Sequence, residues 1–170
     1  MKEVFMTVSK GAYPSGERGD RLVQDDRQDP YMRRQKLQEP SFCAECGAVF
    51  HGGRWQWSDK SDGAEKATCP ACQRIKDDCE AGIVILKGAY YKGHRQEILN
   101  IVRNEEKKEK GQHPLHRVMQ IEEDEGSATI TTTDIHLPKR IGESVRHAHQ
   151  GELALDYDED GYYVRVTWDR

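Results

Sequence analysis

The chain has 170 residues, of which 33% are charged and 35% hydrophobic, so its apolar side chains suffice for one or two small cores and not for one large core. The net charge is −4, and residues 119–170 carry 5 basic and 12 acidic side chains. This distribution excludes a simple polybasic nucleic-acid binder, so any contact with nucleic acid must come from local patches.

Residues 1–40 are predicted to form a flexible tail. Their scattered apolar residues bury too little surface to offset the entropy lost on ordering. The basic cluster of Arg33, Arg34 and Lys36 is either a solvated linker or an arm that contacts phosphates and orders on binding. The N-terminus has no apolar stretch of signal-peptide length, and no segment approaches the length of a membrane span, so a cytoplasmic protein is expected.

Two C-x2-C pairs follow the predicted tail. Cys43 and Cys46 are separated by 22 residues from Cys69 and Cys72. Each pair aims two thiolates at one point, and two pairs complete a tetrahedron around a zinc ion. Because four cysteines leave no coordination position open, the predicted zinc is structural and does not activate water.

Two other interpretations of these cysteines remain open. Two disulfides would require an oxidising compartment, which the N-terminus does not indicate. A redox C-x-x-C pair usually follows a strand in a β-α-β unit and needs no second pair. The fifth cysteine, Cys79, is expected to be a free thiol.

Residues 41–88 are predicted to form the zinc ribbon. A turn at Gly52 and Gly53 indicates a hairpin after the first cysteine pair. The β-branched run at residues 82–86 is expected to be a further strand of the ribbon.

Trp55 and Trp57 are two residues apart in the predicted hairpin, so in a strand they face the same way. They either cover a small core or form, with Arg54, a platform on which nucleic-acid bases stack.

Residues 89–113 are predicted to form a connecting helix, because Ile98, Leu99, Ile101 and Val102 make an apolar stripe at helical spacing. Residues 114–170 are predicted to form a small ββαββ domain with Asp134 as the N-cap of its helix. Its elements are expected at residues 118–122, 128–133, 135–149, 153–157 and 162–168.

The helix at 135–149 carries a stripe of basic residues formed by Lys139, Arg140 and Arg146. This stripe is either a solvated face or a surface that contacts RNA phosphates. None of the seven histidines has a metal-binding spacing such as H-E-x-x-H, so no catalytic residue is predicted.

Three segments resemble a family of small bacterial zinc-ribbon proteins over roughly residues 20–170. They read F-C-A-E-C-G-A-V-F-H-G-G-R-W-Q-W with C-P-A-C-Q-R-I, then H-R-Q-E-I-L-N-I-V-R-N-E-E, then T-T-T-D-I-H-L-P-K-R-I-G-E-S. That family is remotely similar to the archaeal and eukaryotic adaptor that binds the large ribosomal subunit and serves its nuclear export. The resemblance implies metal ligation by the four cysteines and suggests ribosome binding. It does not extend to export, because the adaptor has further zinc knuckles and domains.

The sequence therefore predicts an α+β protein with a flexible tail, a four-cysteine zinc ribbon, a connecting helix and a ββαββ domain. The leading function is a non-enzymatic factor that associates with the ribosome or ribosomal RNA in assembly, quality control or stress. The expected partner is the large subunit or its RNA, with no membrane and no small-molecule substrate. The alternative is a protein–protein adaptor or a transcription-associated zinc ribbon.

Overall fold

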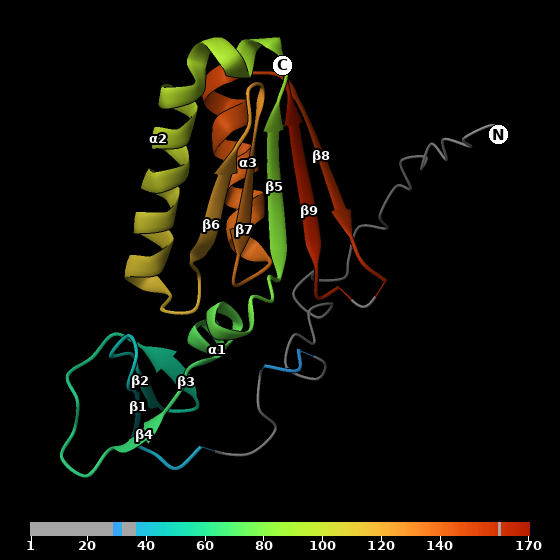
Figure 1. The fold of residues 1–170 in the computed structure, drawn as a ribbon. Helices are drawn as coiled ribbons and strands as arrows, with labels where there is room; N and C mark the ends of the chain where they lie inside the picture. Colours follow the sequence, from blue (N-terminus) through green and yellow to red (C-terminus); the bar gives the residue numbers. More distant parts are fainter. Residues whose placement is uncertain (1–28, 32–36, 160) are drawn as a thin grey trace, which may run out of the picture.

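The structure is a computed structural model that describes residues 29–31, 37–159 and 161–170, and it has two sheets (Figure 1). Arg33, Arg34 and Lys36 lie outside the described residues. The small sheet has the order β3-β2-β1-β4, and the large sheet has the order β6-β7-β5-β9-β8. The α+β class predicted from the sequence is confirmed.

The small sheet and one helix hold the four cysteines. Its strands are β1 (Ser41–Cys43), β2 (Val49–His51), β3 (Arg54–Gln56) and β4 (Glu65–Ala67), and α1 (Pro70–Asp77) follows. Gly52 and Gly53 have φ of 60° and 75°, which suits the tight turn between β2 and β3. Pro70 starts α1 at a position where no backbone N–H is needed.

The large sheet is built around its middle strand. Its elements are β5 (Gly82–Lys87), α2 (Ala89–Gln112), β6 (Val118–Glu123), β7 (Ser127–Thr132), α3 (His136–His149), β8 (Glu152–Tyr157) and β9 (Val164–Asp169). The strand β5 pairs antiparallel with β7 and parallel with β9. The helices α2 and α3 bury one face of this sheet, and Val84, Leu86 and Trp168 lie in the core between them.

Close packing of α3 on the sheet depends on Gly142. A Cβ atom at this position would lie 2.6 Å from Cγ1 of Val166 and 2.8 Å from Cδ1 of Leu153. Leu137, Ile141 and Val145 recur at helical spacing and are fully buried on the same side of α3. The amphipathic pattern therefore decides which face of α3 meets the sheet.

Three features of the predicted organisation differ from the structure. The prediction that residues 82–86 belong to the ribbon is wrong, because β5 is the central strand of the large sheet. The predicted connecting helix, α2, packs Ile98, Leu99 and Val102 into the core of that sheet. The hairpins β6–β7 and β8–β9 of the predicted ββαββ unit do not pair with each other, because β5 lies between them.

Parts of the predicted tail contact the ribbon. A carboxylate oxygen of Asp29 is 2.7 Å from a guanidinium nitrogen of Arg74, whose side chain is buried on α1. The carboxylate of Glu39 accepts hydrogen bonds from the backbone N–H groups of Gly52 and Gly53. Among the described residues, no helix is both long enough and apolar enough to cross a membrane.

Candidate metal centre

The four cysteines meet where β1 approaches the start of α1. Cys43 ends β1 and Cys46 lies in the turn after it, whereas Cys69 caps α1 and Cys72 lies in its first turn. Their Sγ atoms are all within 4.8 Å of one another, and those of Cys46 and Cys69 are 3.7 Å apart. Sulfur atoms about 2.3 Å from a tetrahedral zinc ion lie about 3.8 Å from one another. The four thiols therefore fit a metal ion of this kind.

Backbone N–H groups point at the sulfur atoms. The N–H of Cys69 donates to Sγ of Cys43, and the N–H of Cys72 donates to Sγ of Cys69. Burial alone would raise the pKa of Cys43, but backbone N–H groups lower it to about 7. Burial raises the pKa of Cys69 and of Cys72. Because only the thiolate form ligates, a metal ion that binds must displace the protons that these two buried thiols hold.

Arg117 is a partner of the cysteines that the sequence did not reveal. It lies just before β6 and is only 7% exposed. Its guanidinium donates to Sγ of Cys46 at 3.0 Å and to Sγ of Cys72 at 3.3 Å. Burial alone would lower the pKa of Arg117, but the two sulfur partners raise it above its usual value. Arg117 therefore connects the large sheet to the sulfur cluster, through a contact 45 or more residues apart in the chain.

The aromatic residues of the predicted stacking platform lie against other parts of the protein. Trp55 is half-buried, packs on Phe50 with ring centroids 5.5 Å apart and adjoins the cysteine cluster. The indole N–H of Trp57 donates to the carbonyl oxygen of Lys110, at the end of α2, at 2.5 Å. Arg54 is exposed at the edge of a cavity beside Trp55. These contacts favour a structural role for the two tryptophans.

The basic residues predicted on α3 are not equivalent. Lys139 pairs with Glu143 at 3.9 Å on the same helix, and both side chains are half exposed. Nε of Arg140 lies 3.1 Å from the buried carboxylate of Glu109 on α2. Arg146 is exposed near the end of α3. Two of the three cations are therefore already paired with carboxylates.

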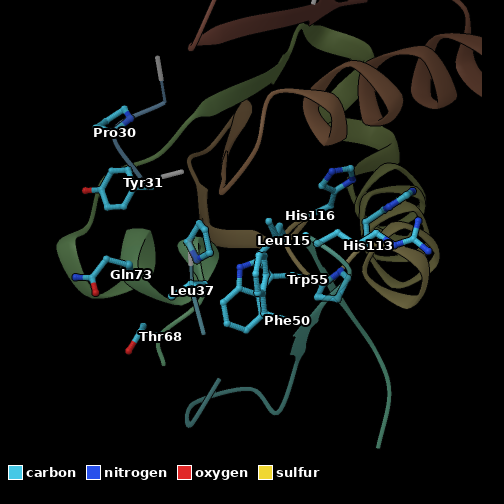
Figure 2. Close-up of a pocket in the computed structure, with 14 residues that line it drawn as sticks. Pro30, Tyr31, Leu37, Phe50, Trp55, Thr68, Gln73, His113, Leu115 and His116 are labelled. Atoms are coloured by element: carbon cyan, nitrogen blue, oxygen red, sulfur yellow. The ribbon is translucent and has the colours of Figure 1, made fainter. Parts of the chain in front are cut away.

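A second group of possible metal ligands went unnoticed in the sequence. Glu109, His113 and His116 place one ligand atom each within 4.8 Å of the others. The two histidines line a cavity of about 650 Å³ between the ribbon and the end of α2, opposite Tyr31 and Gln73 (Figure 2). The E-x3-H-x2-H spacing is the signal that would have found them.

All five cysteines are free of disulfide bonds in the described structure, and Cys79 is exposed beside Arg74. Comparisons with protein-family models, curated proteins and solved structures find no match for this chain. The resemblance to the bacterial zinc-ribbon family stays a prediction, and the function must be inferred from the residues of the sites themselves.

Proposed function

We propose that the protein is a zinc-stabilised, non-enzymatic factor that associates with the ribosome or with ribosomal RNA. The four-cysteine centre supports a structural role for the metal. Four thiolates occupy all four coordination positions of a tetrahedral ion and leave none for a substrate. The resemblance of the cysteine segments to the ribosomal adaptor supports the choice of partner.

Replacing Cys43 and Cys72 together by Ser is expected to remove one tightly bound zinc ion per chain. The two changes take one ligand from each cysteine pair, and the remaining two thiolates bind zinc far more weakly. Elemental analysis of purified wild type and variant measures the difference. A Cys79→Ser variant is the matched control and should keep the full zinc content. Equal zinc in wild type and double variant would show that the four cysteines do not hold the metal.

The observation that carries the RNA proposal is a basic face on α2. The helix carries six exposed cations, against one exposed acidic residue, Glu97, and two partly exposed ones, Glu105 and Glu106. Arg95 pairs with Glu123 of β6, which leaves five cations. None of these five cations forms an ion pair with a described residue. They are Lys92, Arg103, Lys107, Lys108 and Lys110.

The spacing of these cations suits a nucleic-acid backbone. Arg103, Lys107 and Lys110 fall on one line along the straight part of α2, and the line is about 10 Å long at 1.5 Å per residue. Lys92 lies beyond the kink at His94, nearer the start of the helix. The acidic β8–β9 hairpin forms the opposite edge of the large sheet (Figure 1). A local row of unpaired cations of this kind attracts a polyanion even on a protein of negative net charge.

Replacing Lys92, Arg103 and Lys107 by Glu is expected to weaken binding to ribosomes and to ribosomal RNA on the order of 100-fold at 0.1 M salt. Each lost phosphate contact also reduces the salt slope by about 0.7 to 0.9. Co-sedimentation and RNA filter binding over a salt series measure both effects. Circular dichroism checks that α2 is retained, because these side chains are exposed.

The matched control replaces Lys66, Lys87 and Arg165, which are exposed and belong to no predicted RNA contact, by Glu, and it changes the net charge by the same amount. We expect a much smaller loss of binding, because these cations lie on other surfaces than α2. Equal losses in the two variants would mean that overall charge, and not the α2 face, attracts RNA. A wild-type protein that does not sediment with ribosomes at low salt would exclude the ribosome as partner.

One observation favours the alternative function as a protein–protein adaptor. Because side chains alternate along a strand, Ile83 and Ile85 project from the sheet face opposite α2 and α3. They are partly exposed beside Thr129 and Thr131 of the neighbouring strand. Replacing both isoleucines by Thr should leave RNA binding unchanged. If a protein partner covers this face, the same change should weaken the binding of that protein partner.

A further inference from the structure

Three potential ligands lie where α2 runs into the loop before β6. Glu109 is in the last turn of α2, His113 caps the helix, and His116 follows three residues later. The imidazole rings of His113 and His116 have centroids 4.7 Å apart. The helix end and the short loop therefore bring two imidazoles and a carboxylate to one place.

The separations suit a metal ion of ordinary size. Oε2 of Glu109 is 3.2 Å from Nδ1 of His116. Nitrogen and oxygen ligands about 2.0 to 2.1 Å from a tetrahedral zinc ion lie about 3.4 Å apart. His113 is exposed, so its side chain can rotate toward the other two.

The other atoms of two of these ligands lie next to charged groups. Nε2 of His116 lies 3.6 Å from Oδ2 of Asp134, and Oε1 of Glu109 lies 3.1 Å from Nε of Arg140. Metal-binding histidines usually donate their second N–H to a carboxylate, and ligating carboxylates are themselves hydrogen-bonded. The cluster thus has charged groups around the ligand set. Nδ1 of His116 and Oε2 of Glu109 share a hydrogen bond at 3.2 Å, and a metal ion would take the place of the proton between them.

The loop is also held in place. Oγ1 of Thr133 donates to the carbonyl oxygen of Leu115 and accepts from the N–H of Arg117. The Glu109 side chain is only 2% exposed. Oδ1 of Asp134 is buried without a hydrogen-bond partner in the described part of the chain. Two buried or nearly buried carboxylates beside this ordered loop make a site that a cation stabilises.

We propose that Glu109, His113 and His116 form a second metal site for a divalent transition-metal ion such as Zn²⁺, separate from the four cysteines. Two imidazoles and one carboxylate are a ligand set that leaves a coordination position for water or an oxygen anion. Both histidines line the cavity shown in Figure 2, so that position is reached from solvent. This inference does not depend on ribosome association.

Cobalt(II) added to the full-length protein that carries one equivalent of zinc, which fills the four cysteines, tests the proposal, because cobalt reports its ligands by its visible spectrum. We expect one further equivalent to bind, with the bands of nitrogen and oxygen ligation and without a thiolate-to-cobalt charge-transfer band. His113→Ala should weaken this binding by more than the roughly 10- to 100-fold that loss of an outer partner costs. His147→Ala, an exposed histidine on α3, is the matched control and should bind cobalt as the wild type does.

Asp134→Asn examines the positioning of His116 separately. This change keeps the shape of the side chain but removes the negative charge that lies 3.6 Å from Nε2 of His116, so affinity should fall by about 10- to 100-fold. Glu109→Gln should abolish binding. If His116 only bridges two carboxylates as a cation, the zinc-loaded protein takes up no second equivalent, and the proposal is wrong. The proposal is also wrong if His113→Ala takes up cobalt as the wild type does, or if the cobalt spectrum shows thiolate bands alone.

Discussion

Removal of the metal from the four cysteines is expected to destabilise the large sheet as well as the ribbon. Arg117 is buried beside β6, and its guanidinium donates to two of the cysteine sulfur atoms. When the metal leaves, the thiols take up protons, and the cation keeps its burial but loses its negative partners. Breaking a buried ion pair on one side costs about 3 to 5 kcal/mol. Chelation should therefore lower the free energy of unfolding of the β5–β7–β9 region by this order, as measured by amide hydrogen exchange.

The variant Arg117→Met separates this effect from the loss of the ribbon itself. Methionine fills much of the same space and carries no charge, so chelation should now change the stability of the large sheet by less than about 1 kcal/mol. The ribbon should still unfold in both proteins, because its small sheet depends on the metal. An equal loss of protection in wild type and Arg117→Met would show that the coupling runs through contacts other than Arg117.

A fragment of residues 114–170 is expected to remain unfolded, whereas a fragment of residues 80–170 is expected to fold without metal. The strand β5 pairs with β7 and β9 over six positions on each side. Without it the two hairpins have no common strand, and an isolated hairpin is at best marginally stable. The short fragment also lacks the core residues Val84 and Leu86, each of which contributes about 1.5 to 3 kcal/mol by burial.

Both fragments should carry Arg117→Met, so that neither leaves the arginine without its sulfur partners. Amide spectra distinguish a dispersed, folded pattern from a collapsed one. A third fragment, residues 80–170 with Leu86→Ala, should fold with a free energy of unfolding about 2 to 5 kcal/mol lower. Dispersed amide signals from residues 114–170 alone would mean that the hairpins and α3 share a core that does not need β5.

Local patterns were sufficient for the elements themselves. The helix predicted at residues 135–149 is observed at His136–His149, because its apolar residues recur at helical spacing. Asp134 accepts hydrogen bonds from the N–H groups of His136 and Leu137, as an N-cap residue does. The grouping of the cysteines likewise follows from short spacings, because two C-x2-C turns each aim two sulfur atoms at one point.

Sheet membership could not be read from the same kind of pattern. The run at residues 82–86 is β-branched and predicts a strand in either sheet. Its place between β7 and β9 depends on pairings with residues 127–132 and 164–169, which lie more than 40 positions away. Because residues 82–86 directly follow the second cysteine pair in the chain, the sequence suggested that they belong to the ribbon. In the structure they belong to the large sheet, where Val84 and Leu86 are buried against α2 and α3.

The sequence alone thus determined the class of the protein, most of its helices and strands, and the cysteine set, because each depends on neighbours within a few residues. Only the tertiary structure decided which charges are paired. Arg140 meets Glu109 from 31 positions away, and Arg117 meets Cys46 from 71 away. On α2, Arg95 is paired with Glu123, whereas Lys107 and Lys110 form no ion pair with a described residue. The electrostatic role of a side chain depends on the charges that folding brings within a few ångströms of it, and these contacts leave no local signature in the chain.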